Sequence, residues 1–284
     1  MRFWRHNKYL LLLPSFVFVL LFTAFGIGHV LLVSFRDDNW SLVHYHSLLN
    51  SPLFMGSFLL SLKITVIVTV LSLVLGLLVT RVLFYYLRNL KWRVLIWIPM
   101  LIPHFVAAYL VFILFSQTGL VSSLLYQLHL IKDFNSFPIL VNDRQGLGII
   151  LAYTWKSIPF VVLMVLPVYY QLNRNYLDVV KTLGGGRWAM FRDVEWPAVC
   201  PVLLETGIIL FSFVIAAFEI PSLLGATYPK LIPTLSYDWF TGSDWEKRPL
   251  AMAVMVLITA MVLILVQALF LALRKSRYNT MRGR

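Results

Sequence analysis

The chain has 284 residues, of which 60% are hydrophobic and 13% are charged, and its mean hydropathy is +0.82. Soluble domains average about 45–50% apolar and about 25% charged residues, so this composition excludes an ordinary soluble domain and indicates a membrane protein with several spans. The net charge of +12 could suggest a nucleic-acid partner, but no basic domain holds it.

Six apolar stretches are each long enough to cross a bilayer, which takes about 20 mainly apolar residues. They are residues 10–34, 57–80, 94–116, 147–171, 199–221 and 250–273. The first follows Arg2, Arg5 and Lys8 as a signal peptide would, but it exceeds the usual apolar core of about 7–15 residues and no convincing cleavage site follows it. We therefore expect an all-α protein with six transmembrane helices, the first of them uncleaved.

Lysine and arginine are distributed unevenly between the two sides that these spans define. The N-terminus, residues 81–93, residues 172–198 and the tail after residue 273 together hold 16 bases, whereas the other loops hold 6. Cytoplasmic segments carry the excess of Lys and Arg, so the sequence predicts that both termini and residues 172–198 face the cytoplasm.

The segment from Leu177 to Pro201 is a polar-rich run between two strongly apolar stretches. Asn175 can cap a short helix, with Asp178 in the capping-box position. The apolar positions of that helix are Val179, Val180 and Leu183. We expect Gly184, Gly185 and Gly186 to end it, because glycine reaches left-handed backbone angles without strain.

A second short helix is predicted from Arg187, with Trp188, Phe191 and Val194 at three-residue spacing. Pro197 either stops this helix or opens the next one at its first turn. Two short amphipathic helices hinged at glycine, outside the membrane and exposing aromatic surface, predict a docking site for another protein.

Within this loop, Thr182-Leu183-Gly184, Phe191, Val194, Pro197 and Pro201 resemble the EAA loop of ABC-importer permeases. The sequence departs from the family where Asp178-Val179-Val180 replaces the Glu-Ala-Ala triplet. The resemblance covers about residues 57–273, which divides the chain into an N-terminal span with its outer loop (1–56), a type-I permease core (57–273) and a basic tail (274–284).

The resemblance implies a permease subunit of a bacterial ABC importer in the plasma (inner) membrane. Two permease subunits, identical or paralogous, would form the path for a small solute. A binding protein would deliver the solute, and two ATPase subunits would dock on the Leu177–Pro201 loops. The coupling residues carried over are Asp178, Val179, Val180, Leu183, Gly184, Phe191, Val194 and Pro197.

The sequence gives no reason to expect catalysis or a cofactor in this chain. It has no phosphate-binding loop, no His/Cys cluster with metal-ligand spacing and no nucleophile elbow. The single cysteine, Cys200, excludes an internal disulfide. ATP hydrolysis is therefore expected on a separate subunit.

Ionisable groups inside spans are costly and often functional. Glu205 and Glu219 fall in the fifth predicted span, Lys63 in the second and Lys156 in the fourth, where Pro159 is expected to kink the helix. Glu219 and Lys156 either line the solute path or serve ordinary packing and interface roles, and the sequence leaves both alternatives open. Glu205 is expected to reach the cytoplasmic interface.

The segment Phe218–Gly225 looks like the permeases grouped with polyamine, ferric-iron, thiamine and phosphonate importers. This likeness implies that Phe218, Glu219, Pro221 and Gly225 line the outer half of the path, and that a cation such as a polyamine is one candidate solute. Two other classes remain. An ion-coupled secondary transporter would need acids near the midplane, whereas these acids lie toward the ends of one span; a structural membrane protein would not need the glycine-hinged loop.

Overall fold

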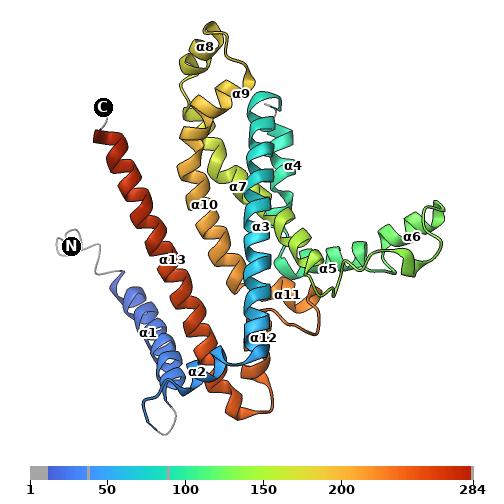
Figure 1. Cartoon of the computed structure of the whole chain (residues 1–284), viewed down its shortest axis with the longest axis vertical. Helices are drawn as coiled ribbons and strands as arrows, with labels where there is room; N and C mark the ends of the chain where they lie inside the picture. The colour runs from blue at the N-terminus through green and yellow to red at the C-terminus, as the bar shows by residue number, and fades with distance from the viewer. Residues whose placement is uncertain (1–11, 37–38, 88–89, 283–284) are drawn as a thin grey trace, which may run out of the picture. The chain divides into compact units, whose positions relative to one another are not determined.

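The computed structural model describes residues 12–36, 39–87 and 90–282 (Figure 1). The bases Arg2, Arg5, Lys8, Arg88 and Arg284, which entered the charge count above, lie outside the described residues. The chain divides into two units, one of Met1–Met55 with Leu235–Leu263 and the other of Gly56–Thr234 with Ile264–Arg284.

No β-strand forms within the described ranges, so the predicted all-α fold class is confirmed. The longer helices are α1 (Leu13–Phe35), α3 (Pro52–Tyr85), α4 (Leu90–Leu101), α5 (His104–Phe115), α7 (Leu147–Gln171), α10 (Trp196–Ala216) and α13 (Arg248–Arg282). The shorter ones are α2 (Val43–Leu49), α6 (Leu120–Gln127), α8 (Arg174–Thr182), α9 (Arg187–Met190), α11 (Glu219–Leu224) and α12 (Ile232–Thr241). A π-turn, η4 (Phe191–Glu195), joins α9 to α10, and 3-10 turns lie at η3 (Phe134–Ser136) and η5 (Trp245–Lys247).

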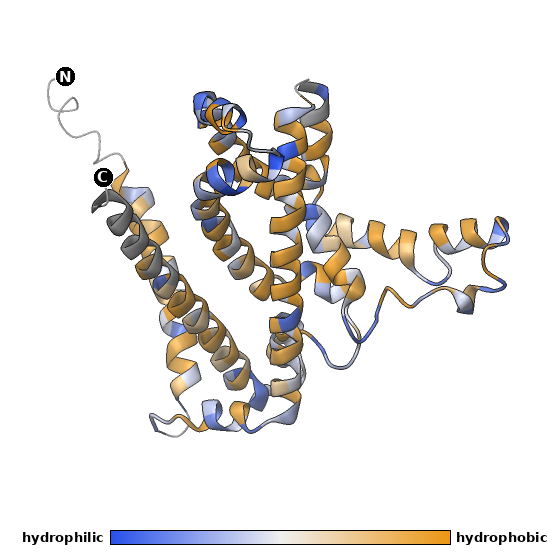
Figure 2. Ribbon diagram, turned by 45° about the horizontal axis from the view of Figure 1, so that its top comes forward, coloured by the Kyte–Doolittle hydropathy of each residue, from blue (hydrophilic) through white to orange (hydrophobic). Residues whose placement is uncertain are grey.

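Six helical stretches in the described part of the chain are long and apolar enough to cross a membrane, as predicted. They are Leu13–Phe35, Pro52–Tyr85, His104–Gln127, Leu147–Gln171, Arg187–Ala216 and Trp245–Ala268. Figure 2 shows the long helices apolar over most of their length, while hydrophilic residues concentrate around α8. The fourth span begins and ends where the sequence predicted, at residues 147 and 171.

The third predicted span, residues 94–116, is wrong as a single helix. The helix breaks after Leu101, and α5 starts at His104 after Pro103. A proline ring clashes with the preceding turn and has no N–H to donate, so Pro103 ends one helix and caps the next. A second break, at residues 116–119, separates α5 from α6.

The fifth span also differs from its predicted range of 199–221. It runs without interruption from Arg187 to Ala216, so the predicted second loop helix and the span form one helical run. Pro197 does not stop this run; it lies in the first turn of α10, as the second of the two predicted alternatives has it. Because Pro197 has no N–H, the turn before it widens, and the Trp196 N–H donates to the Phe191 carbonyl five residues earlier.

Helix α7 is the centre of the larger unit. Thirteen of its 25 residues are buried, and it packs against α4, α5, α10 and α11. Gly76 in α3 permits a close approach to this helix, because a Cβ there would lie 2.5 Å from Cβ of Val161. A side chain at residue 76 would therefore push α3 away from α7.

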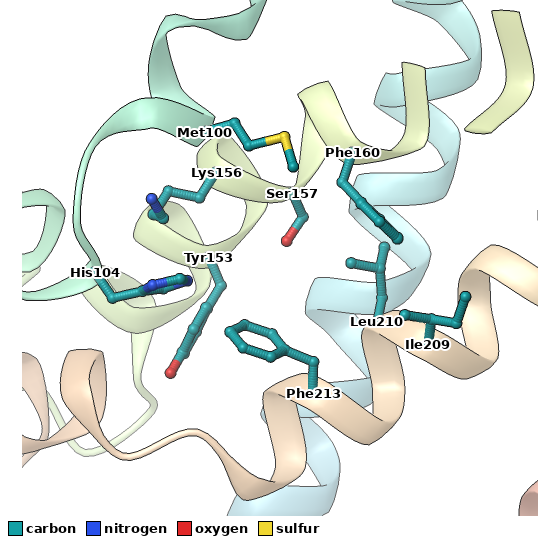
Figure 3. A pocket seen from close by; sticks show the side chains of 9 residues that line it. All are labelled: Met100, His104, Tyr153, Lys156, Ser157, Phe160, Ile209, Leu210 and Phe213. Carbon is teal, nitrogen blue, oxygen red and sulfur yellow. The ribbon is translucent and has the colours of Figure 1, made fainter. Parts of the chain in front are cut away.

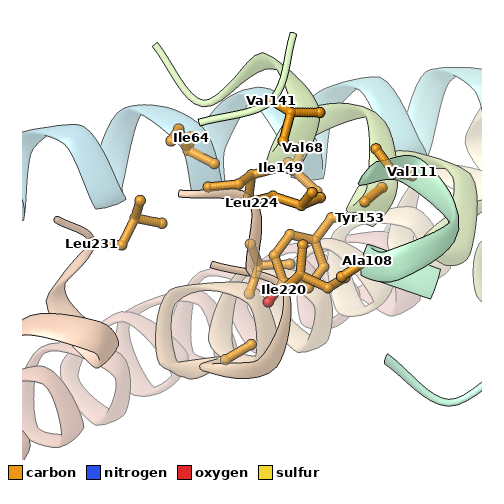
Figure 4. Packing of buried hydrophobic residues seen from close by; sticks show 13 residues of the cluster. Ile64, Val68, Ala108, Val111, Val141, Ile149, Tyr153, Ile220, Leu224 and Leu231 are labelled. Atoms are coloured by element: carbon orange, nitrogen blue, oxygen red, sulfur yellow. The ribbon is translucent and has the colours of Figure 1, made fainter. Parts of the chain in front are cut away.

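Two apolar clusters form the core of this unit. One gathers around Tyr153 and includes Ile64, Ile149, Ile220 and Leu224 (Figure 4). The other gathers around Tyr169 near the loop of residues 172–198 and includes Leu83, Val162 and Val199. Helix α11 thus packs into the core through Ile220 and Leu224 and does not continue the fifth span.

The smaller unit contains α1, α2 and the first half of α13. Tyr45 in α2 donates to Oγ of Ser34 at 2.9 Å, which fixes α2 against the end of α1. Most of α1 is exposed, and Ser34 is its one buried residue. At the start of α13, the Arg248 guanidinium lies 3.7 Å from the Trp245 ring centroid.

The predicted sidedness can be checked with single cysteines in a Cys200→Ser background. We expect Asn175→Cys, in α8, to resist an impermeant thiol reagent added outside intact cells, because the excess of bases predicts a cytoplasmic position for this loop. Ser243→Cys, in the loop before α13, is the matched control and should react. Labelling of Asn175→Cys from outside would overturn the assignment.

Candidate functional site

The first loop helix, α8, starts earlier than the sequence predicted. Its cap is Asn173, whose Oδ1 accepts the Asn175 N–H at 3.0 Å, so the assignment of Asn175 as the cap is wrong. Asn173 holds an extended backbone before the first turn, as N-cap residues do. Asp178 therefore lies past the first turn, where it pairs with Nζ of Lys181 at 3.0 Å.

The end of α8 follows the sequence prediction. Gly184 has φ +77, the left-handed region that a side chain would strain. The Gly184 N–H donates to the Lys181 carbonyl, and the Gly185 N–H donates to the Val180 carbonyl at 2.8 Å. These bonds satisfy the last carbonyls of the helix and turn the chain toward α9.

Large apolar side chains on this loop are exposed to solvent. We call four of them the loop ridge: Tyr176, Val179, Leu183 and Trp188. Leu183 is 81% exposed and Trp188 is 70% exposed, whereas Leu177 on the same helix is buried. Tyr176, Val179 and Leu183 are spaced three and four residues apart, so they share one face of α8 and of the turn that follows it. An exposed apolar face of this kind outside a lipid-facing span indicates a protein partner.

The other predicted coupling residues are less exposed than the loop ridge, or lie beyond α8. Phe191 and Val194 are half-buried in η4, Val180 is half-buried in α8, and Pro197 is exposed in the first turn of α10. The Phe191 ring lies between Trp188 and Trp196, with centroid distances of 5.6 and 5.9 Å. The Arg81 guanidinium lies 4.6 Å from its centroid.

Sequence reasoning missed the most tightly bound residue of the loop, Glu195. Its side chain is fully buried, and three residues donate hydrogen bonds to its carboxylate. Arg81 donates from Nε at 2.8 Å, Tyr85 from its hydroxyl at 2.8 Å and Tyr169 from its hydroxyl at 2.9 Å. We call these four residues the Glu195 cluster.

The Glu195 cluster joins three parts of the chain. Arg81 and Tyr85 lie at the end of α3, Tyr169 lies in the last turn of α7, and Glu195 ends the π-turn. A buried carboxylate without partners would be strongly destabilising, so its hydrogen bonds hold these segments together. The sequence signal was an acid and a base at the ends of neighbouring spans, where such groups tend to pair.

A second polar site lies at the break between α4 and α5. Lys156 in α7 is 7% exposed, and its Nζ donates to the Pro99 carbonyl at 3.0 Å and to the Ile102 carbonyl. Pro103 leaves these carbonyls without helical partners, and unpaired carbonyls are tolerated at membrane depth only where other groups satisfy them. Lys156 thus supplies the hydrogen bonds that these two carbonyls of the broken helix would otherwise lack.

The break opens onto a cavity of about 240 Å³ within the larger unit (Figure 3). Met100 and His104 line it from the two sides of the break. The remaining lining residues come from α7 and α10: Tyr153, Lys156, Ser157, Phe160, Ile209, Leu210 and Phe213. Of the residues predicted for the solute path, only Lys156 lines this cavity.

The other predicted path residues gather at α11. Phe218 precedes this helix, Glu219 is its first residue, Pro221 is buried in it and Gly225 ends it. Glu219 was predicted inside the fifth span, but the helix of that span ends at Ala216. Glu219 is half-buried and close enough to His104 and Tyr153 to interact electrostatically with both. Whether solute passes α11 stays a prediction.

The family description "Binding-protein-dependent transport system inner membrane component" matches residues 72–277, which is more than half of the chain. The chain belongs to this family. The predicted resemblance to ABC-importer permeases is thereby confirmed, and with its six apolar helices the chain is a multi-pass inner membrane protein.

Relatives and solved structures agree with this assignment. A sulfate transport permease of Salmonella typhimurium is 29% identical over 67% of this chain and 65% of its own length. A trehalose transport permease of Mycobacterium tuberculosis is 25% identical over 70% of this chain and 66% of its own length. The chain thus spans slightly less than two thirds of either relative.

Two crystal structures of a bacterial ABC transporter for the acidic polysaccharide alginate contain a chain with the same fold. Their TM-scores are 0.78 and 0.77 at 18% identity, over 97% and 94% of this chain and 99% and 95% of theirs. The second is a complex with a periplasmic protein bound to an alginate pentasaccharide. These structures confirm the predicted type-I permease fold.

The contacts of Glu195 predict that replacing it destabilises the protein much more than replacing the neighbouring acid Asp193. Glu195→Ala should lower the free energy of unfolding by about 3–5 kcal/mol, because it leaves the half-buried Arg81 guanidinium and the hydroxyls of Tyr85 and Tyr169 without their acceptor. Unfolding of the purified protein in one detergent measures this. Asp193→Ala is the control, since Asp193 pairs with Arg192 on the exposed surface and should change little. Equal effects at the two positions would show that Glu195 is not a structural anchor.

Proposed function

We propose that this chain is the membrane-spanning subunit of a bacterial ABC importer and that the loop ridge docks a separate ATPase subunit. One observation carries the proposal: an exposed apolar ridge is attached to the membrane helices through a four-residue polar cluster centred on the fully buried carboxylate of Glu195. An apolar surface exposed to water favours binding, and a rigid attachment suits the transmission of force.

The geometry supports a mechanical role for the loop. ATPase subunits that approach each other on binding ATP would displace α8 and α9. Because Glu195 holds the loop to the ends of α3 and α7, and Arg81 also contacts Phe191, that displacement would move both helices with the loop. The chain thus acts as a lever and supplies the solute path, while ATP is hydrolysed elsewhere.

Two further partners belong to the proposal. A periplasmic solute-binding protein is supported by the alginate transporter, whose structure holds such a protein beside a chain of the same fold. A second permease subunit, identical or paralogous, would complete the path. The exposed apolar surface of α1 would then face lipid or that subunit.

An ion-coupled secondary transporter is the rival class, and it would need no ATPase. Such proteins hold titratable acids near the midplane beside broken helices. Here Lys156, and not an acid, lies at the break between α4 and α5, where it donates hydrogen bonds to the free carbonyls.

The case for a polyamine as the solute depends on Glu219 alone. The charged residue that lines the cavity is Lys156, which is a cation as a polyamine is.

Gly184→Val tests the docking role. The left-handed backbone at Gly184 should cost a side chain about 1–2 kcal/mol, which is too little to unfold the helical bundle but enough to displace the ridge. We expect the variant to insert at normal abundance and to lose the ATPase subunit that co-purifies with the unmodified chain.

Gly186→Val is the matched control. Its φ is −78 and a Cβ there meets no atom within 4 Å, so a side chain fits without strain. This variant should retain the ATPase subunit. Full retention by Gly184→Val, or equal loss from both variants, would contradict a docking role that depends on the geometry of α8.

A further inference from the structure

We propose that the cavity at the α4–α5 break binds the oxyanion group of the transported solute, either an inorganic oxyanion such as sulfate or the carboxylate of an acidic sugar. This inference rests on the proposed import function and names the chemical class of its substrate. It follows from the kinds of polar group that line the cavity.

The first observation is a buried positive charge without a negative partner. Among the described residues, Lys156 contacts two carbonyl oxygens and forms no ion pair with a carboxylate. Carbonyls satisfy two of the three ammonium N–H donors but do not neutralise the charge. A buried cation favours an anion in the adjoining space, and the remaining donor can bind it.

The second observation is a buried hydroxyl on a residue that lines the cavity. Tyr153 is 1% exposed, and its hydroxyl, which lies beside the Ile220 backbone, donates a hydrogen bond to no acceptor among the described residues. Its ring lines the cavity between His104 and Phe213, and the Ser157 hydroxyl turns toward the same space (Figure 3). An unpaired buried hydroxyl is costly, so a ligand that accepts a hydrogen bond from it would be favoured.

The broken helix adds a further favourable element. α5 has 12 residues and begins at His104, on the cavity wall, and no side chain caps its first turn. The first N–H groups of a helix have no partner within it and carry a partial positive charge, which favours an anion. The ammonium, the two hydroxyls and this helix terminus all supply donors.

Neither Glu205 nor Glu219, the two acids of the fifth predicted span, lines this cavity. Glu219 is near enough to influence His104 and Tyr153, but it opens α11 and is not a lining residue. The rest of the wall is apolar: Met100, Phe160, Ile209, Leu210 and Phe213. Such a wall excludes water and strengthens the interaction of the donors with a negative group. A cation would meet no carboxylate on this wall.

Binding to the full-length permease, purified with its ATPase and partner permease in lipid nanodiscs, tests the proposal. The probes are radiolabelled sulfate and glucuronate for the two sources of oxyanion, with glucose as the neutral match of glucuronate and spermidine as the cation. We expect saturable binding of at least one oxyanion, and binding of glucose and spermidine that is at least tenfold weaker.

Tyr153→Phe and Ser157→Ala should each weaken oxyanion binding about tenfold, the usual effect of losing one hydrogen bond to a charged group. Thr154→Val is the control: its hydroxyl, also on α7, is buried without a hydrogen-bond partner in the described part of the chain, but it does not line the cavity. Binding should survive this change.

Three results would overturn the proposal: no saturable binding of either oxyanion, binding that Tyr153→Phe and Ser157→Ala leave intact, or tighter binding of spermidine. Preference for sulfate or for glucuronate identifies the source of the oxyanion. If the ATPase subunit is retained by the unmodified chain and lost from Gly184→Val while oxyanions fail to bind, the ligand class is wrong and the importer function stands.

Discussion

The carboxylate of Glu195 imposes the strictest physical constraint on this fold. It is fully buried, so its charge has to be compensated within the protein, and Arg81, Tyr85 and Tyr169 supply that compensation. These donors come from the ends of α3 and α7, while the acid belongs to the helical run that leaves the loop. One buried charge thereby fixes the loop ridge to two spans, and the proposed lever depends on that attachment.

The membrane imposes a similar constraint at the other polar site. A helix interrupted at Pro103 leaves carbonyls that lipid cannot satisfy, so a donor has to reach them from a neighbouring helix. Lys156 does so from α7, and in turn its charge is held beside a cavity. Both polar sites lie on α7, the most buried of the candidate spans in the described residues, which packs between the interrupted helix and α10.

The sequence predicted what depends on local rules. Span length and hydropathy identified six membrane helices, and the bounds of α7 follow from an apolar run with clear turn residues on both sides. Gly184 was predicted as a left-handed helix end because glycine is suited to that conformation. The capping assignment failed by two residues, since Asn173 and Asn175 are chemically equivalent and only the entry angle of the chain distinguishes them.

What the sequence could not predict depends on contacts between distant segments. Glu195 and Arg81 are 114 residues apart, so no local pattern pairs them, and Arg81 was counted only as one base of a predicted cytoplasmic loop. Lys156 was recognised as unusual, but its role requires the break at Pro103, and that break was hidden because residues 94–116 are apolar throughout. Glu219 was placed in a span since hydropathy does not detect the end of α10 at Ala216.

We propose that the loop and the end of α3 that carries Arg81 and Tyr85 move as one body because Glu195 joins them. Electron–electron distance measurement tests this directly, with spin labels at Asn175 in α8 and at the exposed Tyr86 after α3, in a Cys200→Ser background and with the ATPase bound. We expect one narrow distance distribution that ATP leaves unchanged, and a broader one in Glu195→Gln. A distance that shifts when ATP binds to the chain with Glu195 intact would contradict it.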